Sequence, residues 1–190
     1  MPDSASSGRL DLVESASTHP AIRAAFNAVR ARGTEPLNLH RTIAHAPSLL
    51  APFLDLAFAL RAAPATPRVD RELIILRTAQ LCNSDYVLTH HVGMGEASGL
   101  TAEHIHDLAG WHDSDRFNER QRAILGYADA MFGPEGVQDS TFSSIERLLS
   151  EGEIVELTLT AAFYSGIARF ARALGVPLEP DAASSDYGRT

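Results

Sequence analysis

The sequence has only one cysteine, Cys82, among its 190 residues. A single thiol cannot form an intrachain disulfide, and it cannot form a two-cysteine redox centre. The sequence also lacks any run of 18 apolar residues, and its opening stretch, MPDSASSGRLD, has no apolar segment of the kind found in signal peptides. We therefore expect a cytoplasmic protein without a membrane-spanning segment.

Positive charge is scarce as well, because 16 lysines and arginines stand against 24 aspartates and glutamates, which gives a formal net charge of -8. The basic residues are not clustered, so a phosphate backbone would be repelled and we predict no nucleic-acid partner. Neither the adjacent histidines 90 and 91 nor the HIH stretch at 104–106 has the i,i+4 spacing of a helical zinc site. We therefore predict no bound metal.

Alternating runs of the kind that form β-strands are missing too, whereas apolar residues recur at helical spacing almost throughout. This pattern predicts an all-α protein, with about eight or nine helices marked by capping and breaking residues. No glycine- and proline-rich linker interrupts the middle, so we predict one domain over residues 17–178. Residues 1–16 and 179–190 are small and polar, and we expect them to be mobile tails.

The stretch DYVLTHHVG, residues 85–93, places two histidines side by side on one predicted helix. At about 100° per residue, His91 lies on the inward sector with the small residues Gly95 and Ser98, which leave room for a ligand. His90 lies about 100° away, beside Tyr86. The two imidazoles therefore cannot both point into one small site, and we predict that His91 faces inward while His90 forms a wall or an interface.

Glu72 lies on the preceding predicted helix, in an apolar sector with Leu76 and Ala79. Burying a carboxylate there without a partner would cost on the order of several kcal/mol, so Glu72 needs a hydrogen-bonding or charged partner. Two helices joined by a tight turn pack antiparallel, and the nineteen-residue separation allows Glu72 to meet His91 across the hairpin. Such a pair is either structural or catalytic, and the spacing alone does not distinguish these roles.

Further candidates lie on other predicted helices. Arg41 and His45 are four residues apart and share a helix face, so they form either a carboxylate-binding arginine beside a second histidine or a solvated surface. Tyr164 stands among apolar residues of the last predicted helix, either in a pocket or in the core with its hydroxyl bonded.

These residues carry a family resemblance. The stretch RELIILRTAQLCNSDYVLTHHVGMGEASGLTAEHIHDL resembles the signature hairpin of the carboxymuconolactone decarboxylase and alkylhydroperoxidase D-like superfamily, in which a histidine follows a glutamate by nineteen residues. Here the matching residues are Glu72 and His91, and the resemblance covers residues 20–178. It implies an alkylhydroperoxidase D-like helical bundle that assembles into homotrimers or homohexamers, with active sites near subunit contacts.

Two branches of this superfamily differ in their thiols. Peroxidase members place a Cys-x-x-Cys pair seven and four positions before the histidine, and this sequence has Ser84 and Val87 there. Because the peroxidase needs an activated thiolate and a second, resolving thiol, the resemblance disfavours a peroxidase and leaves Cys82 as an ordinary cysteine. The decarboxylase branch lacks the pair and needs no cofactor. Tyr86 matches its usual aromatic position, although Val87 and Leu88 replace the acidic and aromatic residues that often follow.

The resemblance therefore implies a cofactor-independent carboxy-lyase that acts on a small carboxylated or lactone-like ring. Glu72 and His91 would be its catalytic acid–base pair. The predicted substrate-binding residues are Arg41, His45, Ser84, Tyr86 and His90. The alternatives are an alkylhydroperoxidase-like peroxidase and a non-enzymatic binding protein on the same fold, in which Glu72 and His91 are only a buried polar pair.

Overall fold

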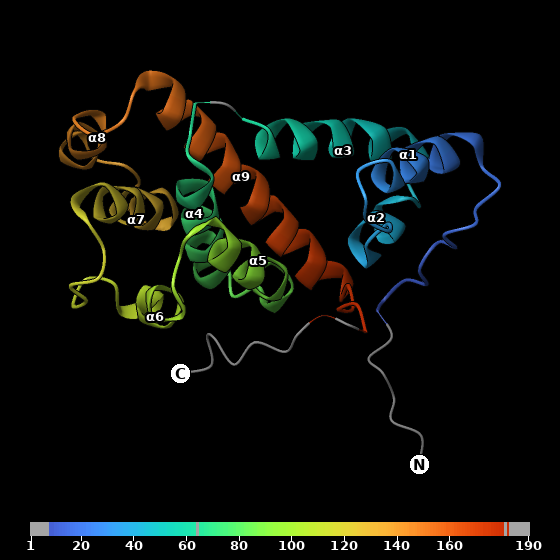
Figure 1. The fold of residues 1–190 in the computed structure, drawn as a ribbon. Coiled ribbons are helices and arrows are strands. Elements are labelled where there is room, and N and C mark those ends of the chain that lie inside the picture. Colours follow the sequence, from blue (N-terminus) through green and yellow to red (C-terminus); the bar gives the residue numbers. More distant parts are fainter. Residues whose placement is uncertain (1–7, 64, 181, 183–190) are drawn as a thin grey trace, which may run out of the picture. The chain divides into compact units, whose positions relative to one another are not determined.

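The computed structural model describes residues 8–63, 65–180 and 182. Over these residues the chain forms nine α-helices, one short 3-10 helix and no β-strand (Figure 1). The prediction of an all-α fold is therefore confirmed. The chain divides into two compact units. The domain predicted for residues 17–178 spans both units, and its unity stays a prediction.

The first unit contains the described residues up to Ala62 and those from Phe170 to Ala182. Its helices are α1 (Pro20–Arg30), α2 (Asn38–Ile43) and α3 (Pro47–Arg61). Proline occupies the first turn of both α1 and α3, where its missing N–H costs nothing. Phe26 of α1 and Leu50 of α3 are fully buried in a shared apolar core.

Helix α3 is less buried than its composition indicates. Only three of its side chains are buried, namely Leu50, Leu54 and Leu60. Leu49 and Leu56 are instead 61% and 46% exposed. The helix carries leucines on several sides, and the core of its own unit covers only some of them.

The two predicted tails lie partly outside the described residues, which begin at residue 8 and end at residue 182. In the described part, Val13 N donates to Arg41 O at 3.3 Å and Arg41 Nε donates to Val13 O at 2.9 Å. At the other end, Asn38 N donates to a carboxylate oxygen of Glu179 at 2.7 Å. The mobility of the tails stays a prediction.

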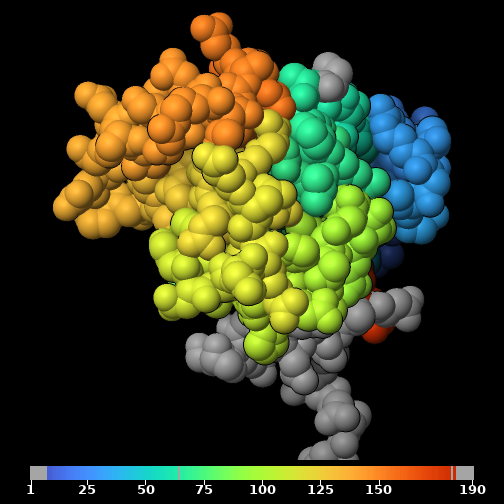
Figure 2. Space-filling view, turned by 60° about the vertical axis from the view of Figure 1, so that its left-hand side comes forward, coloured from blue at the N-terminus to red at the C-terminus, as the bar shows by residue number. Residues whose placement is uncertain are grey.

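The second unit contains the described residues from Ala63 to Arg169. Its helices are α4 (Arg68–Leu81), α5 (Asp85–Ser98), α6 (Ala102–Asp107), η1 (Leu108–Gly110), α7 (Glu119–Phe132), α8 (Asp139–Glu146) and most of α9 (Glu151–Leu174). Helix α4 packs against α5 and α7. Helices α7 and α8, yellow and orange in Figure 2, form part of the surface of this unit.

Helix α9 is the only described helix that is long and apolar enough to cross a membrane, judged by length and composition. Half of its most apolar window is buried inside the protein, which is the pattern of a core helix. It is therefore weak evidence for a membrane span.

The turn between α4 and α5 explains why these helices form a tight hairpin. Asn83 adopts the left-handed region at φ 50°, and its N–H donates to Gln80 O at 2.9 Å. Ser84 N donates to Ala79 O at 2.9 Å, which completes the Schellman motif that ends α4. The Ser84 hydroxyl then accepts from Val87 N and caps α5. Ser84 therefore helps to end one helix and starts the next.

A second side of α4 is held against α7 by two ion pairs. Arg120 Nε lies 2.8 Å from buried Asp70, and the Arg77 guanidinium contacts both oxygens of Asp129 at 2.6 and 3.0 Å. Asp70 and Arg77 are two helical turns apart, so one face of α4 carries both contacts. At about 100° per residue, this face differs from the one that carries Glu72.

The ion-pair network of α7 should make the stability of the fold depend on pH. Burial raises the pKa of the Glu153 carboxyl, but hydrogen bonds from Ser150 and the charge of Arg120 outweigh this effect and hold that pKa below its ordinary value. A carboxyl with a lowered pKa in the folded state stabilises the fold above its unfolded pKa, and this contribution is lost as the pH falls through the folded value. We therefore expect the free energy of unfolding to decrease as the pH drops below about 4.3, the ordinary pKa of glutamate. Urea titrations at neutral and acid pH should show a smaller fall in Glu153→Gln, and equal falls in both proteins would contradict the expectation.

Candidate active site

Glu72 of α4 and His91 of α5 meet inside the hairpin. His91 Nδ1 lies 2.8 Å from a carboxylate oxygen of Glu72, so the predicted contact is present. The two side chains, His91 and Glu72, are only 5% and 7% exposed, which keeps water away from the pair. An ionised carboxylate only accepts hydrogen bonds, so Nδ1 carries a hydrogen and donates it. Nε2 is then the ring nitrogen that can exchange a proton with a substrate.

Gly95 sets the approach of α5 to α4 at this level. A Cβ at this position would lie 3.0 Å from Leu76 Cδ1 and 3.2 Å from Leu100 Cδ1, closer than ordinary packing distances. Leu76 is fully buried and cannot easily move aside. The expectation that Gly95 leaves room for a ligand is therefore wrong, because these leucines fill the space. Gly95 instead allows the close helix packing within which the pair forms.

Two further side chains surround the pair. The Tyr164 ring of α9 meets the His91 ring edge-on, with centroids 4.7 Å apart. Arg68, the first residue of α4, places Nε 3.7 Å from the other oxygen of Glu72 and is 57% exposed. Arg68 thus connects a buried carboxylate with the protein surface. Sequence reasoning missed Arg68, although its position four residues before Glu72 was an available signal.

The other predicted residues of α5 lie around its first turns. His90 points to a different side from His91, and its ring centroid lies 4.4 Å from that of buried Tyr86. This arrangement agrees with the predicted helical phase. Ser84 is buried and caps the helix. The substrate-binding roles of Ser84, Tyr86 and His90 stay predictions.

Arg41 and His45 belong to the first compact unit, where both side chains bind backbone carbonyls. Arg41 Nε donates to Val13 O at 2.9 Å, and Nη1 donates to the Asn38 side chain at 3.4 Å. His45 Nε2 lies 2.7 Å from Asp11 O. The observed partners of these two residues fix the N-terminal segment, and their role in binding substrate stays a prediction.

Cys82 follows the last residue of α4 and is buried in the turn. The positions at which peroxidase members of the superfamily carry their thiols hold Ser84 and Val87 in this chain. The N-terminal turn of α5 therefore has no thiolate to activate.

Replacing Cys82 with serine should leave the protein folded and its activity unchanged. The change is small and nearly isosteric, so we expect the free energy of unfolding to change by no more than about 1 kcal/mol. Chemical denaturation and turnover of the wild type and Cys82→Ser, measured side by side, test this. Loss of activity with an unchanged unfolding curve would contradict it and indicate a single-thiol mechanism.

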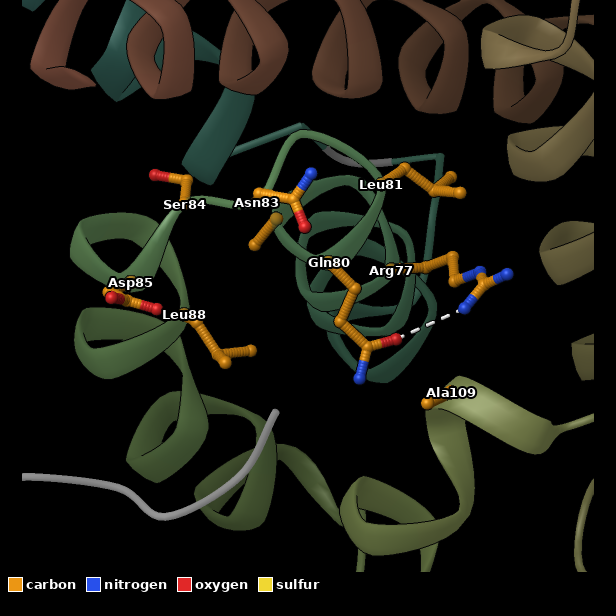
Figure 3. A pocket seen from close by; sticks show the side chains of 9 residues that line it. Arg77, Gln80, Leu81, Asn83, Ser84, Asp85, Leu88 and Ala109 are labelled. Atoms are coloured by element: carbon orange, nitrogen blue, oxygen red, sulfur yellow. Dashed lines mark hydrogen bonds between the residues drawn. The ribbon is translucent and has the colours of Figure 1, made fainter. Parts of the chain in front are cut away.

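A cavity of about 270 Å³ lies beside the hairpin turn (Figure 3). It is lined by residues of α4, the start of α5 and Ala109 of η1, and Arg77 Nη1 donates to Gln80 Oε1 at 3.2 Å within it. Neither Glu72 nor His91 lines this cavity. Within the described part of the chain, no three histidine, cysteine or carboxylate side chains come together as a group that could hold a metal ion.

Comparison with known families identifies the fold. Residues 47–130 match the model of the carboxymuconolactone decarboxylase family, and this segment contains both Glu72 and His91. Over this segment the chain is similar to the carboxymuconolactone decarboxylase family, which supports the resemblance seen in the sequence. A search of curated proteins finds no match to the sequence.

Solved structures agree with this assignment at the level of the fold. An uncharacterized peroxidase-related protein from Silicibacter sp. TM1040 is 16% identical, with a TM-score of 0.79, and the match covers 93% of this chain and 94% of that one. A peroxidase-related protein with an alkylhydroperoxidase AhpD core, from Ralstonia eutropha JMP134, is 21% identical, with a TM-score of 0.75 and coverage of 92% and 94%. The debrominase Bmp8, in a cysteine-to-alanine variant bound to 2,3,4-tribromopyrrole, is 20% identical, with a TM-score of 0.75 and coverage of 89% and 91%.

Proposed function

We propose that the protein is a cofactor-independent lyase of the carboxymuconolactone decarboxylase type, which acts on a small carboxylated or lactone-like ring. The observation that supports this most is the buried contact between Glu72 and His91, 2.8 Å apart, in a chain whose single cysteine lies outside the peroxidase positions. This arrangement supplies a proton donor but no pair of thiols. It therefore suits proton transfer better than peroxide reduction.

The chemistry follows from the pair. When the carboxylate leaves as carbon dioxide, the electrons of the broken C–C bond remain on the ring as a carbanion or enolate. Protonated His91 then donates its Nε2 proton to that carbon, and solvent restores the proton after product release. Glu72 accepts from Nδ1, fixes the ring orientation and stabilises the imidazolium while it exists. Low exposure of both side chains strengthens this interaction.

Arg68, beside Glu72, is a positively charged side chain that suits an acidic substrate. Arg68 is more than half exposed and carries a permanent positive charge 3.7 Å from Glu72. We propose that it attracts the substrate carboxylate toward the pair. The complex of the debrominase with a tribrominated pyrrole supports the size of the ligand, because it places a small five-membered ring on the same fold.

Two alternatives remain in competition with the lyase. Peroxidase-related structural relatives favour a peroxidase, but this chain would have to perform that reaction with one buried thiol. A binding protein would keep Glu72 and His91 as a structural pair. The two alternatives predict different outcomes from the lyase, since neither releases carbon dioxide.

A screen of purified protein against carboxylated lactones and enol-lactones tests the proposal. Each compound is incubated in D₂O, carbon dioxide release is followed, and the product mass is determined. We expect carbon dioxide release from at least one compound, with one deuterium in its product. Release from none of them, while the protein binds one, would favour the binding protein and contradict the lyase.

We also propose a homotrimer or homohexamer located in the cytoplasm. Exposed apolar side chains support assembly: Leu49 and Leu56 on α3, and Val155 and Leu159 on α9, which are 57% and 52% exposed. Isolated exposed leucines are common, but two such side chains on each of these helices support a covered surface on each unit taken by itself. Light scattering at micromolar concentration should therefore give three or six times the chain mass of 20.5 kDa. A monomer would contradict this expectation.

A further inference from the structure

A pocket of about 310 Å³ lies within the first compact unit, between the end of α1, the start of α2 and the C-terminal half of α3. Its volume is at the lower end of the range of about 300–1,000 Å³ that is typical of small-molecule sites. Leu54 and Phe58 of α3 and Val29 of α1 form apolar walls. The pocket therefore suits the apolar body of a ligand with one or two rings.

The polar side of this pocket is basic. Arg32 and Arg61 line it, and none of the residues that line it, all of which are described, is acidic. The whole chain carries a formal net charge of -8, so this is a local reversal of sign. An anion is attracted to such a local concentration of positive charge. The charge thus selects an anionic ligand.

Arg32 is held in an orientation that suits a carboxylate. Its guanidinium carbon lies 3.7 Å from the centroid of the Phe58 ring, and Nη1 donates to Ala28 O at 2.9 Å. Stacking on an aromatic face fixes the plane of the guanidinium, which lowers the entropy lost on binding. One of its five N–H groups is used in the bond to Ala28, and the fork keeps further donors for a ligand.

His40 places an imidazole in the wall of the pocket. Its Nδ1 accepts from Leu37 N at 3.1 Å, so in the neutral ring the hydrogen is on Nε2. The ring packs edge-on to Phe53 at 6.5 Å, which limits its rotation. The pocket thus combines apolar walls with two cations and an imidazole.

We propose that this pocket is a second binding site, formed by different residues from those of the acid–base pair, for a small molecule with a flat apolar body and one carboxylate. Arg32 and Arg61 bind the carboxylate, and the body lies against Leu54 and the apolar walls. The inference does not depend on the lyase, because its evidence is confined to α1, α2 and α3.

Calorimetric titration of the full chain with 2-naphthoate, and with the neutral 2-naphthalenemethanol, tests the site. We expect the carboxylate to bind at least about tenfold more tightly than the alcohol, because hydrogen bonds to a charged group are the stronger ones. Arg32→Gln and Arg61→Gln should each weaken naphthoate binding at least about tenfold. Arg23→Gln is the matched control, since Arg23 is exposed on α1 and does not line the pocket.

Two further variants distinguish binding in this pocket from binding at the acid–base pair. Ala57→Phe fills the pocket without removing charge, and it should abolish binding. His91→Gln should bind naphthoate like the wild type. Thermal unfolding shows whether each variant is folded. If Ala57→Phe does not fold, the two arginine variants alone test the proposal. Equal binding of both probes, or binding lost in His91→Gln but kept in Arg32→Gln, would overturn the proposal.

Discussion

Replacing His91 with glutamine should lower turnover by about 10² to 10⁴, the usual effect of removing a general acid or base. Glutamine can accept or donate a hydrogen bond near Glu72, but it has no proton to transfer to a carbanion. The fold should survive, because the amide can take the place of Nδ1, which lies 2.8 Å from Glu72. Turnover is measured on the compound identified by the carbon dioxide screen, and thermal unfolding reports the fold.

The neighbouring histidine is the matched control. His90 belongs to the same helix and packs against Tyr86 rather than Glu72, so His90→Gln should cost much less. Glu72→Gln should resemble His91→Gln, because a neutral amide cannot stabilise the imidazolium. Equal losses at both histidines would contradict the assigned roles. Full activity in His91→Gln would make the buried pair structural.

Replacing Arg120 with alanine should lower the free energy of unfolding by about 3–5 kcal/mol, the cost of breaking a buried ion pair. Arg120 lies 2.8 Å from Asp70, whose side chain is 4% exposed, and 2.5 Å from Glu153. Its Nη1 also donates to Leu148 O at 2.9 Å. Burial lowers the pKa of Arg120, but the two carboxylates outweigh burial and raise it. Without Arg120, a buried carboxylate of α4 loses its charge partner.

Arg116→Ala is the control for this stability prediction, since Arg116 pairs with Asp107 at 3.1 Å and is about half exposed. Exposed ion pairs contribute little to stability, so the urea unfolding curve of Arg116→Ala should barely move. Adding Asp70→Asn to Arg120→Ala should recover part of the lost stability, because it removes the uncompensated charge. Similar losses in Arg116→Ala and Arg120→Ala would contradict a special role for the buried network.

Local rules made much of the second unit predictable from sequence. The helix of residues 85–98 follows from capping by Ser84 and termination at Gly99. Its phase separates His90 from His91, and the same reasoning on α4 places Glu72 on a different face from Asp70 and Arg77. Contact between Glu72 and His91 then follows, because a short turn requires antiparallel packing of two helices whose phases are known.

Other features could not be predicted because they depend on contacts between distant segments. Arg41 shares a helix face with His45, but periodicity carries no information about the Val13 carbonyl that Arg41 binds. The stacking of Arg32 on Phe58 likewise joins two segments whose distance the sequence does not fix. Composition likewise records how apolar α3 is but not how much of it the rest of its unit covers.

Hydroperoxide consumption and carbon dioxide release, measured side by side in the wild type and Cys82→Ser, test most directly whether the protein works through an acid–base pair rather than a thiol. We predict that both proteins release carbon dioxide at the same rate and that neither consumes hydroperoxide. Hydroperoxide consumption by the wild type that disappears in Cys82→Ser would contradict the acid–base mechanism.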